Sequence, residues 1–314
     1  MGLESMIYSV AGKRLISAFL TVGCLALAVT DFGCRRNAVK TPEPVSMRQV
    51  TDDLGRTVTI PVEVRRVVSL APNLTENIFA VGAGDRLVGV TTFCNYPERA
   101  KAIAKIGDTM NPNMESIVAL KPDMVFVSTA SQIEAFTKTL EANGIAVYVT
   151  NPDSLDGVMK NLKQLGELFG TQDQAEKLVS DLQRRTEAAS PPPAYLLRHP
   201  TVFVQISREP LFTVGKSSFL TEIVARAGGH SVTADIDAAY PKISKETALI
   251  LNPEIIILSD SEDNREPNDV FKNSPAVKNG RAYKINADII SRPGPRLVDA
   301  LEQISKSLGL TVSH

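Results

Sequence analysis

NMESIVALKPDMVFV at residues 113–127 is echoed by SKETALILNPEIIIL at residues 244–258. Each copy begins with a residue that caps helices, has a glutamate two positions later, and continues through an apolar turn to a proline. An acidic residue and an unbroken apolar run follow the proline. This order predicts a short capped helix that ends before the proline and leads into a buried strand. Two such units predict two lobes of similar build.

Other parts of the chain repeat in the same order. Leu-Thr-Glu at 74–76 opens a helical stretch that reaches Gly82, and Leu-Thr-Glu at 220–222 opens one that reaches Gly228. The glutamates of both triplets are interpreted as acids in a first helical turn, where the helix dipole favours them. The repeat is far longer than the roughly 20–50 residues of a solenoid unit. Because strands alternate with helices in both halves, the sequence predicts an α/β protein with two mainly parallel sheets.

The segment between the repeats reads as helical throughout. Apolar residues recur at helical spacing through 155–189, with a break at Gly170-Thr171. If the chain crosses only once between the halves, and does so as a helix, the link is stiff. The sequence therefore predicts two lobes joined by a long rigid helix. The predicted boundaries are 1–34 for a signal or lipoprotein segment, 35–50 for a tether, 51–154 for the N-terminal lobe, 155–190 for the interlobe helical segment and 191–314 for the C-terminal lobe.

The N-terminal segment has the features of an export signal. Lys13 and Arg14 precede residues 15–30, which are almost wholly apolar or small. Cys24 and Cys34 each follow a glycine, as in many bacterial lipoprotein signals. The chain behind Cys34 is polar and contains proline, so Cys34 is the predicted lipidation site. A cleaved soluble form and an uncleaved anchor are the alternatives. All three place the folded part outside the cytoplasm, in the periplasm or at the cell surface.

Composition argues against several classes of protein. The net charge of −1 over 314 residues provides no basic footprint for nucleic acid. The three histidines, at 199, 230 and 314, form no cluster with metal-ligand spacing, so no metal site is predicted. The sequence contains neither a Gly-x-Ser-x-Gly nucleophile motif nor a glycine-rich phosphate loop. A binding protein is therefore favoured over an enzyme, and Cys94 is predicted to fill the core or a pocket wall.

The sequence resembles the iron-chelate and vitamin-B12 family of periplasmic binding proteins. The resemblance covers roughly residues 56–310, and its most specific stretches are 113–123, VVSLAP at 67–72 and RPGPR at 292–296. The order and spacing resemble the vitamin-B12-binding members most. The resemblance implies a monomer with two α/β lobes joined by one rigid helix and a ligand cleft between them. It also implies delivery of the ligand to an ABC importer, with no cofactor.

The resemblance further implies a docking role for two glutamates. In this family, one glutamate at a helix start on each lobe contacts arginines of the permease dimer. By motif position these are Glu115 and Glu246. The alternative is that both are ordinary first-turn acids, which the helix dipole stabilises by about 0.3–1 kcal/mol without any partner.

Ligand-facing positions of the family fall on loops after strand ends, as is general for parallel sheets. By resemblance they correspond to Pro72, Asn73, Phe93, Tyr96, Thr109, Phe212, Tyr240 and Arg292. The aromatic faces suit a flat, partly apolar macrocycle, and Arg292 could pair with amide oxygens, phosphate or carboxylate of a ligand. Thr109 and Tyr240 replace two indoles of the best-known B12 binders, so a more polar or roomier cleft is expected. Ordinary packing is the alternative for each residue.

The predicted ligand is a small-molecule chelate, with cobalamin or a related corrinoid as the first choice. A ferric siderophore is the second choice. Haem is less favoured, because no histidine or tyrosine is clearly placed as an axial ligand. A sensor or accessory protein that signals without transport is the remaining alternative.

Overall fold

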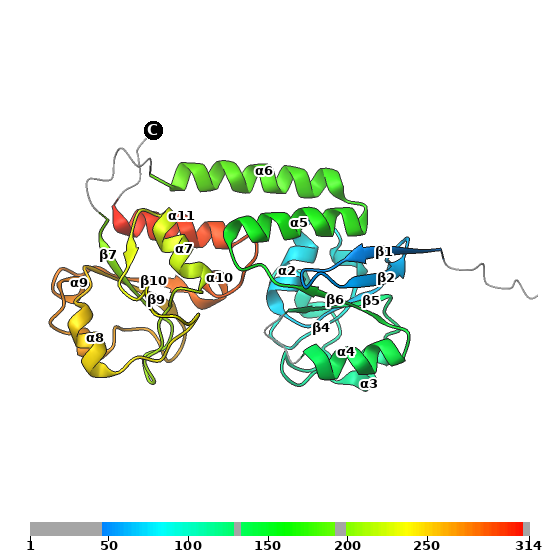
Figure 1. Cartoon of the computed structure of the whole chain (residues 1–314), viewed down its shortest axis with the longest axis horizontal. Coiled ribbons are helices and arrows are strands. Elements are labelled where there is room, and N and C mark those ends of the chain that lie inside the picture. The colour runs from blue at the N-terminus through cyan, green and yellow to red at the C-terminus, as the bar shows by residue number, and fades with distance from the viewer. Residues whose placement is uncertain (1–45, 129–132, 192–198, 310–314) are drawn as a thin grey trace, which may run out of the picture. The chain divides into compact units, whose positions relative to one another are not determined.

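A computed structural model describes residues 46–128, 133–191 and 199–309, which contain two four-stranded parallel sheets and one hairpin (Figure 1). The sheet of the first lobe has the order β4-β3-β5-β6. These strands are β3 (Val67–Ser69), β4 (Leu87–Val90), β5 (Met124–Ser128) and β6 (Ala146–Thr150). The helices between them are α2 (Pro72–Ala80), η1 (Gly84–Arg86), η2 (Glu98–Ala102), α3 (Met114–Ala119) and α4 (Ile133–Ala142). β5 is buried from Met124 to Val127, as expected for a parallel strand covered on both faces.

The sheet of the second lobe has the order β10-β9-β7-β8 and is also wholly parallel. Its strands are β7 (Thr201–Gln205), β8 (His230–Ser231), β9 (Ile255–Asp260) and β10 (Ala282–Asn286). Its helices are α7 (Phe219–Arg226), α8 (Lys245–Leu251), η4 (Asp269–Phe271), α9 (Pro275–Lys278), α10 (Ala287–Ile290) and α11 (Leu297–Leu308). The two sheets confirm the predicted fold class.

The sequence repeat forms the same structure in both lobes. The Asn113 side chain accepts a hydrogen bond from the backbone N–H of Ser116 at the start of α3, and Ser244 caps α8 in the same way. Lys121 and Asn252, which occupy equivalent positions, both adopt the left-handed conformation, with φ of 47° and 41°. Each of these residues lies just past the end of its helix and directly before a proline, and the chain then enters β5 or β9.

The link between the lobes consists of two helices, which meet at the predicted break at Gly170-Thr171. α5 (Leu155–Phe169) ends at Gly170, whose φ of 68° turns the chain back. α6 (Gln172–Ala189) then packs against both α5 and α11 (Figure 1). Arg185 of α6 donates hydrogen bonds to Asp299 and Glu302 of α11, at 2.6 and 2.7 Å between nitrogen and oxygen.

Helices α2, α5, α6, α7 and α11 share one continuous hydrophobic core with both sheets. The opposite face of each sheet has its own smaller core, with α3 and α4 in the first lobe and α8 and α9 in the second. The shared layer therefore joins the lobes through packed side chains rather than through a flexible loop. The predicted lobe boundaries stay predictions, because the folded part of the chain from Val45 onward forms one compact unit.

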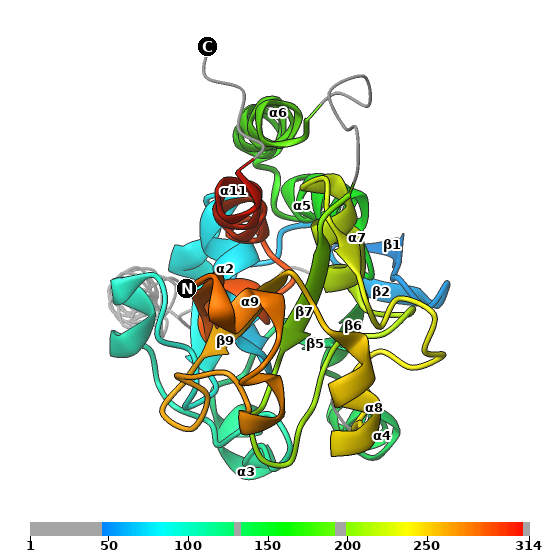
Figure 2. The same cartoon turned by 90° about the vertical axis from the view of Figure 1, so that its left-hand side faces the viewer.

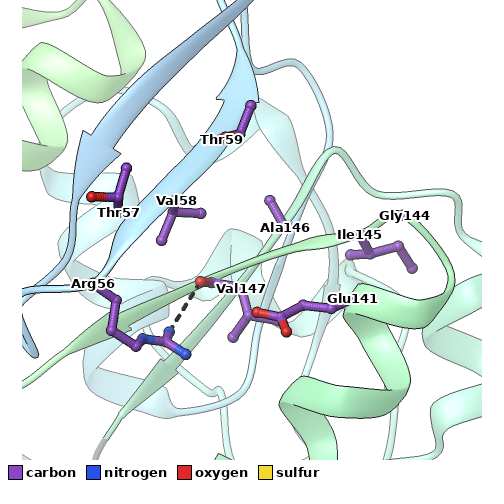
Figure 3. Close-up of a pocket in the computed structure, with 9 residues that line it drawn as sticks. All are labelled: Arg56, Thr57, Val58, Thr59, Glu141, Gly144, Ile145, Ala146 and Val147. Atoms are coloured by element: carbon purple, nitrogen blue, oxygen red, sulfur yellow. Dashed lines mark hydrogen bonds between the residues drawn. The ribbon is translucent and has the colours of Figure 1, made fainter.

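A hairpin of β1 (Met47–Thr51) and β2 (Thr57–Pro61) precedes β3 and includes residues 47–50, the last residues of the predicted tether. Alternate residues of β1 are half-buried, so this strand belongs to the folded part of the chain. The turn between these strands protects the free edge of β6: Asp53 N–H donates to Val149 O, and Arg56 donates to Val147 O (Figure 3). The hollow of about 300 Å³ at this junction lies between β2 and β6, and we assign it a structural role.

The N-terminal predictions, including Cys24 and Cys34, lie outside the described residues. Within the described part of the chain, none of the helices combines the length and apolar character needed to cross a membrane.

Candidate functional site

A pocket of about 630 Å³ lies where the loops after the strand ends of both lobes approach one another. In the first lobe it is lined by Ala71, Pro72, Asn73, Phe93, Thr109, Ser128 and residues 150–153. In the second lobe it is lined by residues 217–219, Ala239, Tyr240, Asp288 and residues 291–293. Loops after the carboxyl ends of parallel strands are the usual ligand site of such sheets. We call this pocket the cleft.

Local sequence explains how two strands supply residues to the cleft. Pro72 begins α2 directly after β3, and the Thr75 hydroxyl donates to the Ser69 hydroxyl at 2.9 Å, which ties the helix start to the strand end. In the second lobe, Asn286 ends β10 and its side chain caps α10. This turn brings Asp288 and Arg292, one helical turn apart, to the cleft wall.

The structure brings together some of the predicted ligand residues. Pro72, Asn73, Phe93, Thr109, Tyr240 and Arg292 line the cleft, whereas Tyr96 and Phe212 do not. Tyr96 instead lies under the guanidinium of Arg296, with 4.2 Å from the guanidinium carbon to the ring centroid. Phe212 is half-buried, and its backbone bridges Ser207 and Lys242. Tyr96 and Phe212 therefore lie outside this lining, and their role as ligand contacts stays a prediction.

Two aromatic side chains stand out on the cleft wall. Phe93 of the first lobe is 59% exposed and Tyr240 of the second is 43% exposed, which is unusual for large rings in a folded domain. Burial of its hydroxyl end raises the pKa of Tyr240 above the ordinary value of 10, although a hydrogen bond with Ser218 opposes the shift. Tyr240 is therefore a neutral phenol at physiological pH, and both rings offer uncharged faces to a ligand.

Arg292 is held by acceptors of the protein itself. One terminal nitrogen donates to Glu76 Oε1 and Asn95 Oδ1, both at 2.8 Å, and the other donates to Asp288 Oδ1 at 2.5 Å. Its side chain is only 11% exposed. The predicted pairing of Arg292 with ligand oxygens must therefore compete with these bonds.

Glu76 is a site residue that sequence reasoning missed. It was interpreted as a first-turn acid, but α2 begins at Pro72 and Glu76 lies beyond its first turn, with its side chain 2% exposed. Besides Arg292, it accepts two hydrogen bonds from Arg296, at 2.6 and 2.8 Å. Burial opposes the charged form of Arg296, but the hydrogen bonds and charge of Glu76 outweigh it and raise the arginine's pKa above its ordinary value.

The charged side chains that line the cleft include more carboxylates than cations. Arg292 is the only cationic side chain among its described lining residues, and Asp153 and Asp288 are the carboxylates. His199 and His230 lie outside this lining, around a separate hollow near β8. In the described ranges, no three His, Cys, Asp or Glu side chains are placed to share a metal ion. Cys94 is buried beside the hydroxyls of Thr75 and Thr91.

The predicted docking glutamates occupy equivalent exposed positions. Glu115 lies in the first turn of α3 and Glu246 in the first turn of α8. Figures 1 and 2 show α3 and α8 on the side opposite α6. A hydrogen bond from its own backbone N–H, and then one with Ser244, lower the pKa of Glu246. Leu249 and Ile250 of α8, 62% and 82% exposed, add an apolar surface next to Glu246.

The fold and the cleft define a two-lobed binding protein. A family model described as "Periplasmic binding protein" matches residues 67–290, and the chain belongs to that family. The uncharacterized ABC transporter substrate-binding lipoprotein YvrC of Bacillus subtilis is 32% identical over 82% of this chain and 84% of its own length. The vitamin B12-binding protein of Vibrio cholerae is 29% identical over 78% of this chain and 89% of its own.

Solved structures of periplasmic binding proteins have a similar fold. The periplasmic vitamin B12-binding protein BtuF of Vibrio cholerae has a TM-score of 0.67 and 28% identity, over 79% of this chain and 98% of its own. The periplasmic heme-binding protein RhuT of Roseiflexus has a TM-score of 0.68 over 78% of this chain and 98% of its own, but at 23% identity it shows the fold alone.

These similarities define the general activity. The chain is an extracytoplasmic substrate-binding protein of the ABC transporter type rather than an enzyme, which confirms the predicted class. A permease is the partner that such a protein serves. The monomeric state and the expected lack of a cofactor stay predictions.

Proposed function

We propose that this protein binds cobalamin or a related corrinoid in the cleft and delivers it to an ABC permease. The observation that carries the proposal is the pair of exposed rings, Phe93 and Tyr240, which line one pocket from opposite lobes. A flat macrocycle with apolar faces and an amide-rich rim matches two uncharged rings in a mainly apolar lining that also carries polar groups. The volume of about 630 Å³ lies within the range of about 300–1,000 Å³ usual for small-molecule sites.

The charge of the cleft favours a corrinoid over most alternatives. Cyanocobalamin is electrically neutral, whereas a ferric catecholate carries three negative charges and haem carries two carboxylates. The two lining carboxylates repel such anions, and Arg292 is already paired. The raised pKa of Tyr240 also disfavours the phenolate that would coordinate ferric haem iron. A neutral ferric hydroxamate is the second candidate, because the charge argument does not exclude it.

Titration of the purified protein with four probes tests the proposal. The probes are cyanocobalamin, a neutral ferric hydroxamate, a ferric catecholate and haemin. Because the chain contains no tryptophan, calorimetry or ligand absorbance is the suitable measurement rather than indole fluorescence. We expect cyanocobalamin to bind at least about 100-fold more tightly than the catecholate or haemin, a difference of about 2.7 kcal/mol. Tight binding of the hydroxamate without cobalamin binding would keep the cleft and overturn the corrinoid.

Docking to the permease is proposed to use Glu115 and Glu246. Their equivalent places on α3 and α8 offer one exposed carboxylate per lobe, which suits a permease built from two subunits. Arginines on the permease would supply the complementary charge.

Membrane attachment through a lipid on Cys34 is a separate proposal. It is supported by the glycine before Cys34 and by the polar, proline-containing chain behind it. Replacement of Cys34 by alanine should move the protein from the membrane fraction to the soluble fraction of cells. An unchanged distribution would remove Cys34 as the anchor.

A further inference from the structure

Glu76 lies behind the cleft wall and contacts the arginine that lines it. Its carboxylate accepts hydrogen bonds from Arg292 at 2.8 Å and from Arg296 at 2.6 and 2.8 Å. Asp288 pairs with Arg292 on the cleft side. Two arginines are thus balanced by two carboxylates, and this four-residue set, which we call the charge cluster, has no net charge.

Burial makes the inner part of the charge cluster hard for a ligand to displace. The side chain of Glu76 is 2% exposed, and those of Arg292 and Arg296 are 11% and 16% exposed. Charge interactions among such groups are screened weakly by water and salt. An incoming anion would have to replace Glu76 or Asp288 as the partner of Arg292, and Asp153, which lines the cleft from the first lobe, would repel it. A neutral ligand meets neither obstacle.

We infer that Glu76 is a positioning residue that sets the charge selectivity of the cleft. By neutralising Arg292 from behind, it makes the cleft reject anionic chelates and accept neutral ones. Glu76 is absent from the cleft lining, so the effect runs through Arg292 rather than through contact with the ligand. The inference rests on the proposed function, because it takes the cleft as the ligand site.

The test compares a ferric catecholate with two neutral probes, cyanocobalamin and a neutral ferric hydroxamate. In Glu76→Gln the shape of the side chain is kept and the charge cluster gains one positive charge. We expect the affinity for the catecholate, relative to whichever neutral probe binds, to rise at least about tenfold, equivalent to about 1.4 kcal/mol.

Two further variants separate charge from structure. Glu76→Gln combined with Arg296→Gln returns the charge cluster to neutrality, so the gain in catecholate affinity should disappear. Asp288→Asn adds the same positive charge at a side chain that is 37% exposed, and should reproduce the gain even if Glu76→Gln does not fold. Thermal unfolding of each variant checks the fold.

The outcomes distinguish this inference from the proposed ligand. If the unmodified protein binds a neutral hydroxamate and no cobalamin, the corrinoid proposal is overturned. The role of Glu76 is then tested by the ratio of the catecholate affinity to the hydroxamate affinity. An unchanged ratio in the folded single variants overturns the role of Glu76, whatever the natural ligand is. An equal gain in the double variant also overturns it, since charge would then not be the cause.

Discussion

Reversal of both Glu115 and Glu246 to arginine is expected to abolish ligand uptake while ligand affinity stays within about twofold of the unmodified value. Both side chains are exposed in first helical turns, so arginine can be placed there without disturbing the core. If arginines of the permease face them, two attractions become two repulsions. Like-charge contacts cost several kcal/mol together, so uptake should fall by about 100-fold or more. Uptake of radiolabelled ligand by cells and calorimetry on the purified variant provide the two measurements.

A control variant with the same charge change is available on the opposite side. Asp173 and Glu176 are exposed near the start of α6, which lies away from α3 and α8 in Figures 1 and 2. Reversing both to arginine should leave uptake and affinity unchanged. Normal transport by the Glu115/Glu246 double variant would show that docking uses other groups. Single reversals should each have a smaller effect than the double, since one lobe still docks.

The fold was predictable because its determinants are local and occur twice. The cap, the apolar turn and the proline of 113–127 act within a few residues of one another, and 244–258 repeats them. The left-handed Lys121 and Asn252 show that even the turn geometry is shared. The reversal at Gly170 also had a local signal, a glycine at the end of a helical pattern, but the pattern could not say whether the second helix continued or folded back.

The cleft was less predictable because its geometry depends on contacts between distant segments. Glu76 and Arg296 are 220 residues apart in the sequence and come together through the packing of both lobes on the shared helical layer. Nothing near Glu76 in the sequence distinguishes it from an ordinary surface acid. A clue was present in the arginines of RPGPR at 292–296, two cations in a stretch that the fold buries and that therefore needs acidic partners.

Aromatic residues in loops were assigned by resemblance without knowledge of what else lay nearby. The ring of Tyr96 packs against the guanidinium of Arg296, and the backbone of Phe212 forms bridges with Ser207 and Lys242. Phe93 and Tyr240 remain on the cleft wall with large exposed fractions. The distinction depends on tertiary neighbours, which one sequence does not specify.

Replacement of Phe93 and Tyr240 together by alanine is expected to weaken corrinoid binding by at least about tenfold, or about 1.4 kcal/mol. Each ring offers its exposed face from one lobe, so a bound macrocycle should lose apolar contact on both sides. Aromatic contacts are worth about 0.5–1.5 kcal/mol each beyond the area they bury, so the expected loss is modest for two rings. Stability should change little, since neither ring belongs to a buried cluster. Calorimetric titration with cyanocobalamin measures the loss.

The matched control for this pair removes the same number of exposed apolar side chains elsewhere. Leu249 and Ile250 of α8 lie outside the cleft lining and are exposed to similar or greater extents than the two rings. Their replacement by alanine should leave cobalamin affinity unchanged, which separates ring contact from a general loss of apolar surface. If the Phe93/Tyr240 variant binds as tightly as the unmodified protein, the rings do not contact the ligand. The corrinoid proposal would then lose the observation on which it depends, because Phe93 and Tyr240 are the exposed rings that line the cavity from opposite lobes.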